Sequence, residues 1–325
     1  MPMFPSRLGL GLAALGRPAY ITLGRSHDLG DDRSVESMFG RSAAVLDAAW
    51  AAGVRYFDVA RSYGRAEEFL ARWLSERNVS AAAVTVGSKW GYRYTADWRL
   101  DAAVHEQKEH SLARFREQLA QSRALLGERL DVYQIHSATL ESGCLDDAAL
   151  LEALVEGRER GAYRAVGLTL SGAGSAATLE RALAVRASGV RVFDAVQATF
   201  NLLEPSLTRG LAVAHAEGLG VIAKDVFANG RLSPANDRLE DAALLVTLER
   251  AAAAPGLTID GLAMAWVLSH PFVDVALSGA ATPAQIASHA SSVDRPLPAA
   301  TRAAVESLVE GPERYWSTRA SLPWT

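Results

Sequence analysis

The sequence predicts a (β/α)8 barrel, a TIM barrel with its active site at the carboxyl ends of the strands. Short apolar strands alternate about eight times with helices, and glycine or proline separates them, as in a closed parallel sheet. Three successive strands end in a titratable residue, namely Asp58, Lys89 and His136. The length of 325 residues suits one barrel, and no interdomain linker is evident. We therefore expect a single domain over residues 1–325.

The predicted strands are short runs rich in β-branched and aromatic residues. They are expected at 8–15, 54–59, 83–90, 130–136, 163–170, 193–200, 219–225 and 272–278. Helices are expected at 43–52, 102–126, 146–160, 175–187, 207–217, 241–254, 258–269 and 283–291. Several of these helices end at a glycine, namely Gly53, Gly127, Gly161 and Gly218. Glu67 and Glu68 suit the first turn of a further helix, because the helix dipole favours acids there.

Other stretches are expected to be irregular. Residues 24–40 are polar and acidic and predict a surface loop, and residues 90–98 predict an aromatic loop. His105 and His110 fall within the expected helix 102–126, where we expect them to face solvent. The residues after 291 predict a short helix and a tail.

The first strand has an alternative interpretation. Leu8 to Leu15 superficially matches the Gly-x-Gly-x-x-Ala turn of a dinucleotide-binding fold, which requires a helix opening at the glycines. Gly16 and Pro18 follow at once, and both resist a helix. We therefore favour a strand whose glycines allow close approach of neighbouring chain.

Composition narrows the classes of function. Apolar residues make up 49% and charged residues 22%, which is ordinary for a globular enzyme. The net charge of −4 and the lack of a basic run argue against a nucleic-acid partner. No long apolar run or signal peptide is evident, so we expect no membrane association and a cytoplasmic location. The single Cys144 excludes an internal disulfide, and we name no metal ligand.

The residues at the strand ends suit proton transfer to a carbonyl oxygen. Neighbouring strand ends converge in a parallel barrel, so Asp58, Lys89, His136 and the nearby Tyr63 are able to meet. A lysine ammonium is expected to lower the pKa of Tyr63, and Asp58 to hold that lysine charged. A neutral His136 is able to donate a hydrogen bond to the carbonyl oxygen.

Each of these residues also has an ordinary structural interpretation. Asp58 fits a helix cap or surface charge, Lys89 a solvated strand end, and His136 a half-buried histidine. Tyr63 is able simply to cover an apolar edge. Their occurrence after successive strands favours a shared site.

These segments resemble those of the aldo-keto reductases. The catalytic signature of the family is similar to Gly-Val-Arg-Tyr-Phe-Asp-Val-Ala-Arg-Ser-Tyr-Gly-Arg-Ala-Glu, followed by Gly-Ser-Lys-Trp-Gly and Tyr-Gln-Ile-His. The resemblance implies Tyr63 as general acid, Lys89 and Asp58 as its tuning pair, and His136 as the carbonyl-orienting residue. It also implies hydride transfer between NAD(P)H and an aldehyde or ketone.

The resemblance implies a set of cofactor contacts along the chain. Thr169 is able to replace the serine of the family's Ser-Asn pair, whereas Leu170 cannot replace the asparagine. Lys224 stands where many members stack an aromatic ring on the nicotinamide. The implied contacts are Leu12, Asp58, Thr169, Gln197, Lys224, Phe227, Asn229, Gly230, Arg231, Ser278, Gly279, Ala280, Thr282, Gln285 and His289.

The choice between NADP and NAD stays open at this point. Many NADPH-preferring relatives have basic residues where this chain has Gly279, Ala281 and Gln285, and His289 replaces a common asparagine. A helix amino terminus near Thr282 suits a phosphate. NADPH is therefore favoured only by the family, and NADH is the alternative.

The expected substrate is a small carbonyl compound or sugar, with Trp90, Tyr92 and Trp98 as candidate pocket walls. These aromatic side chains are equally suited to packing on the barrel rim. Two other functions stay open, namely an NAD-dependent sugar or alcohol dehydrogenase and a cofactor-binding regulatory subunit. The oligomeric state is not predicted.

Overall fold

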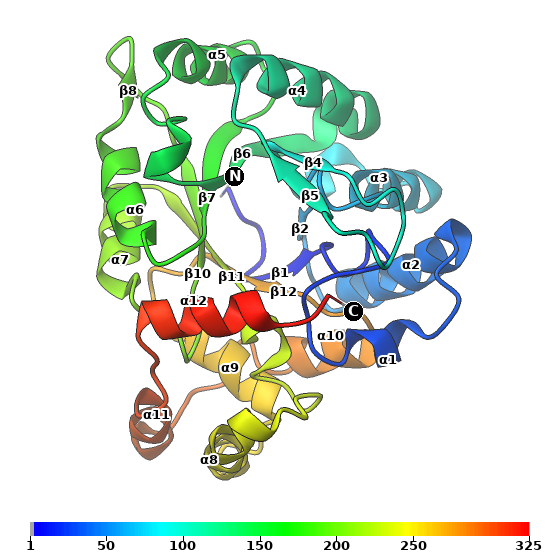
Figure 1. The fold of residues 1–325 in the computed structure, drawn as a ribbon, viewed down its shortest axis with the longest axis vertical. Coiled ribbons are helices and arrows are strands. Elements are labelled where there is room, and N and C mark those ends of the chain that lie inside the picture. The colour runs from blue at the N-terminus through cyan, green and yellow to red at the C-terminus, as the bar shows by residue number, and fades with distance from the viewer. Residues whose placement is uncertain (1–2, 325) are drawn as a thin grey trace.

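The computed structural model describes residues 3–324 and shows a closed barrel ringed by helices (Figure 1). Eight parallel strands follow one another around the barrel, and the last pairs with the first. These strands are β1 (Leu8–Gly11), β2 (Tyr56–Asp58), β3 (Thr85–Trp90), β6 (Leu130–Ala138), β7 (Ala165–Leu170), β10 (Ala195–Thr199), β11 (Gly220–Lys224) and β12 (Val275–Ser278). The predicted (β/α)8 barrel is confirmed. Residues 1, 2 and 325, at the ends of the predicted domain, lie outside the described residues.

Helices follow each strand and cover the outside of the barrel (Figure 1). They are α1 (Arg25–Leu29), α2 (Val35–Ala51), α3 (Ala66–Glu76), α4 (Leu112–Leu126), α5 (Ala148–Glu159), α6 (Ser175–Ala184), α7 (Thr208–Ala216), α8 (Ala242–Ala253), α9 (Ile259–Leu268), α10 (Pro283–Ala290), α11 (Ala299–Glu306) and α12 (Pro312–Ser321). In the part of the chain that the structure describes, no helix combines the length and apolarity needed to cross a membrane.

The expectation of a surface loop over residues 24–40 is wrong. This stretch holds α1 and the first turn of α2. Ser34 caps α2, because its hydroxyl accepts a hydrogen bond from the backbone N–H of Ser37. The acidic residues around this cap gave the stretch its loop-like composition.

The predicted helix over residues 102–126 begins ten residues later than expected. The preceding residues form an antiparallel hairpin of β4 (Tyr92–Tyr94) and β5 (Glu106–Lys108), in place of an aromatic loop. Ser111 then caps α4 by accepting a hydrogen bond from the N–H of Arg114. His105 and His110 therefore lie in this hairpin region, and both are half-buried, contrary to the expected solvated face.

The carboxyl-terminal half differs from expectation at two points. The helix predicted over 175–187 ends at Ala184, and the short hairpin β8 (Arg186–Ala187) and β9 (Val190–Arg191) follows it. After α10 the chain forms two helices, α11 and α12, where one was expected. Helix α12, red in Figure 1, crosses in front of the barrel strands.

The inside of the barrel has its own apolar core, separate from the layer between strands and helices. Six of the eight strands supply it, through Tyr56, Val132, Ala165, Ala195, Ile222, Val275 and Leu277. The ring of Phe4 packs edge-on against Tyr56 with 5.2 Å between ring centroids. A Cβ atom on Gly9 would lie within 3 Å of this core, which confirms the predicted close-approach glycine. Turns follow β1 up to Pro18, so the dinucleotide-turn alternative for Leu8 to Leu15 does not hold.

Candidate active site

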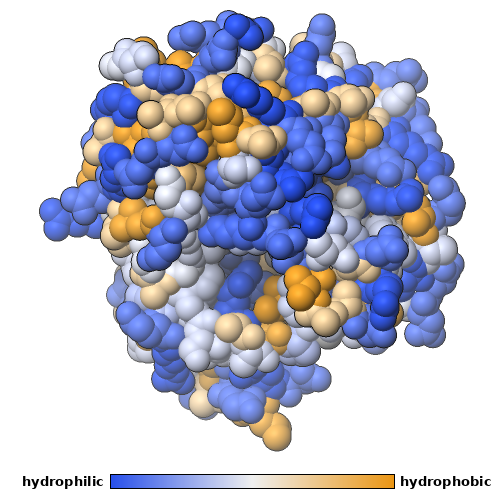
Figure 2. Space-filling view, turned by 45° about the horizontal axis from the view of Figure 1, so that its top comes forward, coloured by the Kyte–Doolittle hydropathy of each residue, from blue (hydrophilic) through white to orange (hydrophobic). Residues whose placement is uncertain are grey.

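A cavity of about 420 Å³ opens where the barrel strands end. The last residues of four strands line it, namely Gly11 of β1, Asp58 of β2, Lys224 of β11 and Ser278 of β12. Figure 2 shows a hollow on this side of the molecule with hydrophilic residues inside it. The cavity therefore lies at the face where barrel enzymes bind their substrates.

Tyr63 reaches this cavity from the loop between β2 and α3, and two glycines fix that loop. The N–H of Arg65 donates to the carbonyl oxygen of Gly16 at 2.7 Å. A Cβ atom on Gly16 would lie 2.3 Å from the Tyr63 carbonyl oxygen, and one on Gly64 would lie 2.5 Å from the Gly16 carbonyl oxygen. Only glycines allow this contact between the loops, and Gly64 also has a positive φ of 60°.

Below Tyr63, Asp58 and Lys89 form a buried ion pair. Their side chains are 1% and 0% exposed, so water contributes almost nothing to the solvation of either charge. The Lys89 ammonium also donates to the Val59 carbonyl oxygen at 3.0 Å. The second Asp58 oxygen accepts hydrogen bonds from three neutral donors, on Tyr56, Gln134 and Gln197. The pair is thus held in one geometry.

The structure brings the four predicted catalytic residues together. The Lys89 Nζ atom lies 4.7 Å from the centroid of the Tyr63 ring. The rings of Tyr63 and His136 meet edge to face with centroids 5.5 Å apart. Asp58 completes the group through its ion pair with Lys89.

The pKa of Tyr63 moves in the direction opposite to the sequence expectation. Burial raises this pKa well above its usual value of 10, and the Asp58 carboxylate raises it further. The guanidinium of Arg17, 5.2 Å from the ring centroid, opposes these effects. Because Asp58 already neutralises the Lys89 charge, the lysine does not outweigh burial. Tyr63 is consequently a neutral phenol at pH 7, able to donate a hydrogen bond.

His136 is also neutral. Burial lowers the pKa of its imidazole well below the usual range, and the positive charges of Lys89 and Lys224 lower it further. The ring of Tyr92 packs against it with centroids 4.9 Å apart. Its backbone carbonyl oxygen lies 2.8 Å from the Nε2 atom of His110. A neutral imidazole in this position is able to donate one N–H toward a bound carbonyl oxygen.

Of the residues predicted to bind the carboxamide group of the nicotinamide, one lines the cavity and the other lies in the core. Gln197 lines the cavity, and its amide nitrogen donates to Asp58 at 2.9 Å. Thr169 and Leu12 are fully buried and do not line the cavity. The Thr169 hydroxyl oxygen accepts the backbone N–H of Ser137 at 2.7 Å. Thr169 thus positions Ser137, a cavity residue, instead of facing a ligand.

Lys224 lines the cavity as predicted, together with a partner that the prediction omitted. Its ammonium donates to Asp225 and to the hydroxyl of Thr199, each at 2.8 Å. Burial lowers the pKa of Lys224. Burial alone would raise the pKa of Asp225, but Lys224 and Arg319 outweigh it, so this carboxylate is ionised. A charged pair therefore replaces an aromatic platform here.

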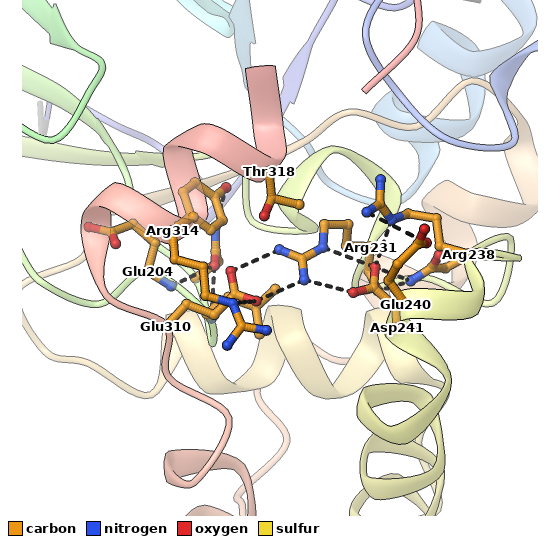
Figure 3. Close-up of polar contacts among 12 residues, drawn as sticks. Glu204, Arg231, Arg238, Glu240, Asp241, Glu310, Arg314 and Thr318 are labelled. Carbon is orange, nitrogen blue, oxygen red and sulfur yellow. Dashed lines mark hydrogen bonds and ion pairs between the residues drawn. The ribbon is translucent and has the colours of Figure 1, made fainter. Parts of the chain in front are cut away.

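The loop after β11 contributes Phe227, Asn229 and Gly230 to the cavity, as predicted, but not Arg231. The guanidinium of Arg231 forms paired hydrogen bonds with both oxygens of Asp241 and both oxygens of Glu310 (Figure 3). All three side chains are less than a tenth exposed. Arg231 thus fastens this loop to the chain beyond α11 and does not line the cavity, so its contact with a pyrophosphate stays a prediction.

Arg231→Met is expected to destabilise the protein by about 3 kcal/mol, because it removes the buried cation that Asp241 and Glu310 share and leaves them only the more exposed Arg238 and Arg314. Arg314→Met is the matched control. Arg314 approaches the same Glu310 at 3.9 Å but is 78% exposed, so its loss should cost less than about 1 kcal/mol. Urea unfolding of both variants measures the difference, and equal small losses would contradict the assignment of Arg231.

Between β12 and α10, only Ser278 and Gly279 line the cavity. The amino terminus of α10 is capped from within the chain: the Gln285 side chain accepts the N–H groups of Ala281 and Thr282, and Thr282 caps Gln285 in return. Ala280, Thr282, Gln285 and His289 do not line the cavity, and their ligand contacts stay predictions. These backbone donors are already used and are not free for a phosphate.

His289 supports the cavity wall from behind. Its ring stacks on Phe227 with centroids 4.2 Å apart, and its Nδ1 atom lies 2.8 Å from the Ser278 hydroxyl. On the other side, its Nε2 atom lies 3.1 Å from Asp260. His289 therefore positions two cavity residues, Phe227 and Ser278.

Comparison with known proteins places the chain in a family. A sequence model of the aldo/keto reductase family matches residues 8–310. The chain belongs to this family. Members of the family carry out oxidoreduction of carbonyl compounds, and the protein is accordingly an oxidoreductase.

Individual relatives of this aldo-keto reductase are distant in sequence. A D-threo-aldose 1-dehydrogenase from a Pseudomonas species is 26% identical in an alignment of 240 residues that covers 69% of this chain and 69% of the relative. The solved aldo-keto reductase AKR11C1 from Bacillus halodurans, in its holo form, is 20% identical, with a TM-score of 0.69 over 94% of this chain and 93% of that one. PA4992 from Pseudomonas aeruginosa is also 20% identical, with a TM-score of 0.63 over 90% and 93%.

The predicted substrate walls of this aldo-keto reductase are only partly at the cavity. Tyr92 lines it. Trp90 is completely buried between sheet and helices, where its ring packs on Phe115 with centroids 5.1 Å apart. Trp98 lines a separate pocket of about 280 Å³ beside Gly64. Trp90 and Trp98 are therefore not expected to contact a ligand in the main cavity.

Several cavity residues of this aldo-keto reductase escaped the sequence prediction. Two of them, Ser137 and Asp225, directly follow predicted site residues at strand ends, so the strand-end rule was able to reveal them. Ser171 likewise follows the last residue of β7. Others come from segments with no such signal, among them Arg17, Tyr20, Glu106, Arg319 and Trp324.

Proposed function

We propose that this aldo-keto reductase transfers a hydride from NAD(P)H to an aldehyde or ketone, with Tyr63 as the proton donor. The observation that carries the proposal is the position of a neutral, half-buried phenol next to a buried Asp58–Lys89 pair and beside a neutral His136. Reduction of a carbonyl needs a hydride at carbon and a proton at oxygen, and the dinucleotide supplies the hydride.

The chain's own residues supply the other half of the reaction. His136 donates a hydrogen bond to the carbonyl oxygen and orients it. As the oxygen gains negative charge, the Tyr63 hydroxyl transfers its proton to that oxygen, and the alcohol forms. The ammonium of Lys89, 4.7 Å from the ring centroid, then stabilises the resulting phenolate until water returns a proton.

The cavity suits an elongated dinucleotide. It extends from Tyr63 and His136 to Asn229 and to Gly279 at the end of β12. A Cβ atom on Gly279 would meet nothing within 4 Å, so this part of the wall is bare backbone. Ser278 and Gly279 carry no charge for a 2′-phosphate. NADPH is accordingly proposed from the family's usage. NADH is the alternative, and it is favoured by the lack of charge at Ser278 and Gly279.

A second candidate function is the oxidation of an aldose at C1 by the same residues in reverse. It is favoured by the likeness to D-threo-aldose 1-dehydrogenase and by the polar groups of the cavity, which include Lys224, Asp225 and Ser137. Polyhydroxylated substrates need such hydrogen-bonding partners. A purely regulatory barrel is disfavoured, because the four catalytic residues are assembled.

The test begins with fluorescence titration of the protein with NADPH and NADH, followed by addition of 4-nitrobenzaldehyde. We expect binding of at least one dinucleotide and oxidation of that cofactor by the aldehyde. Reduction of NAD⁺ or NADP⁺ by an aldose, without aldehyde turnover, would favour the dehydrogenase. If neither dinucleotide binds, the proposed function is wrong.

A further inference from the structure

Helix α12 places one cationic side chain, Arg319, in the wall of the cavity. Its Nε atom donates to the Oδ1 atom of Asn229 at 3.1 Å, and its guanidinium lies 5.5 Å from the centroid of the Trp316 ring. The side chain is half-buried. These contacts aim Arg319 inward from a helix that crosses the barrel end (Figure 1).

The other charged side chains of this cavity are paired. Arg17 contacts Glu106 at 2.5 Å, Lys224 contacts Asp225 at 2.8 Å, and Asp58 is bound by Lys89 behind the wall. Among the residues from 3 to 324, no carboxylate lies within ion-pair distance of Arg319. The cavity, with Lys89 included, thus carries one positive charge in excess. Arg319 is the cation without an ion-pair contact, and the Asp225 carboxylate acts on it only from a longer distance.

A purely structural role explains only part of this arrangement. Holding Asn229 uses the Nε–H group of Arg319, while its two terminal nitrogens have no hydrogen-bond acceptor in the described chain. A guanidinium is a rigid fork that matches the two oxygens of a phosphate or carboxylate. The guanidinium of Arg319 is half-buried, faces a polar cavity and has free N–H donors. It is therefore suited to bind a phosphate or a carboxylate.

We propose that Arg319 binds an oxyanion of the ligand in this cavity, either a phosphate of the dinucleotide or a carboxylate of the carbonyl substrate. The inference rests on the proposed function, since both anions belong to its reactants. It adds a residue from α12 to the binding site. The contact between Arg319 and Asn229 joins this helix to the loop that borders the proposed dinucleotide site.

The test compares Arg319→Met with Arg314→Met, a control on the same helix whose guanidinium is 78% exposed and outside the cavity. Fluorescence titration is expected to show NADPH or NADH binding weakened about 10- to 100-fold in Arg319→Met, as for a lost charged hydrogen bond. Arg314→Met should bind like the wild type. Arg319→Lys, which keeps the charge without the fork, should fall between them.

Two further measurements distinguish a substrate carboxylate from a dinucleotide phosphate as the anion, and distinguish both from a purely structural effect of the substitution. If Arg319 binds the substrate, dinucleotide affinity will stay unchanged, while the KM for 4-carboxybenzaldehyde will rise at least tenfold relative to 4-nitrobenzaldehyde. If Arg319 binds a phosphate, the salt dependence of dinucleotide affinity will weaken in Arg319→Met, which a structural disturbance alone would not produce.

The proposal is overturned if Arg319→Met matches the wild type within twofold in dinucleotide affinity and in the ratio of the two KM values. It is also overturned if Arg319→Lys loses affinity as fully as Arg319→Met and the salt dependence is unchanged. A wild-type protein that binds no dinucleotide contradicts the proposed function instead. Calorimetric titration with inorganic pyrophosphate then tests Arg319 by itself, through binding to the wild type and its loss in Arg319→Met.

Discussion

Tyr63→Phe is expected to lower kcat for carbonyl reduction by about 10²- to 10⁴-fold, the usual contribution of a positioned general acid. The substitution removes one hydroxyl and keeps the ring that packs against His136. Dinucleotide affinity should stay within about twofold of the wild type, since the phenol is proposed to act only on the carbonyl oxygen. Steady-state turnover and fluorescence titration measure the two quantities on the same preparation.

The control for this prediction is Tyr94→Phe. Tyr94 lies on the same side of the barrel but lines the separate pocket beside Gly64, and its loss should not change kcat. A Tyr63→Phe enzyme with near-normal kcat would show that the proton comes from another group. Water or His136 would then be the donor.

The same residue determines a pH dependence. A phenol donates its proton only while it is protonated, and the folded-state pKa of Tyr63 is raised by burial and by Asp58. Activity that needs this proton is therefore present below that pKa and lost as the pH rises through it. The alkaline limb of kcat for reduction should consequently lie above pH 10, the usual tyrosine value. An alkaline loss centred near pH 8 would indicate a different acid.

Lys89→Met is expected to destabilise the protein by about 3 to 5 kcal/mol and to abolish turnover. It leaves the Asp58 carboxylate 1% exposed with neutral donors only, and an unpaired buried charge is strongly unfavourable. Loss of the ammonium also removes the group that stabilises the Tyr63 phenolate. Urea unfolding followed by circular dichroism measures the first effect.

A double-mutant cycle isolates the ion pair. Asp58→Asn alone leaves Lys89 buried and unpaired, so the double variant Asp58→Asn/Lys89→Met should be more stable than either single variant. The control is Arg72→Met, whose ion pairs with Glu36 and Glu76 are solvated and whose loss should leave the stability nearly unchanged. Additive losses in the cycle would mean that Asp58 and Lys89 act independently.

The catalytic end of the site was predictable because its signals are local. Asp58 closes a strand, Lys89 and His136 lie near strand ends, and Tyr63 follows in the next loop. In a parallel barrel the carboxyl ends of all strands lie at one face. A residue that ends a predicted strand can therefore be placed at that face from the sequence. The fold class and the meeting of these residues therefore follow from pattern alone.

The rest of the cavity depends on partners far apart in the chain. Glu106 is 89 residues from Arg17, and Glu310 is 79 residues from the Arg231 that it helps to turn away from the cavity. The rise in the Tyr63 pKa comes mainly from burial of the side chain. Burial depends on the whole fold, so it could not be predicted from the charged residues near Tyr63 in the sequence. Arg319 reaches the cavity from a helix beyond the barrel, where the strand-end rule gives no information.

The closure of β12 against β1, with α12 across the open end, affects the order in which the protein acquires its properties during synthesis. A ribosome must release residues up to 278 before the sheet is able to close on itself. Residues 312–321 emerge later still, at roughly 5 to 20 residues per second. A nascent chain interrupted between these points would contain all eight barrel strands and Tyr63 but lack Arg319. The proposed oxyanion contact would therefore be the last part of the site to be synthesised.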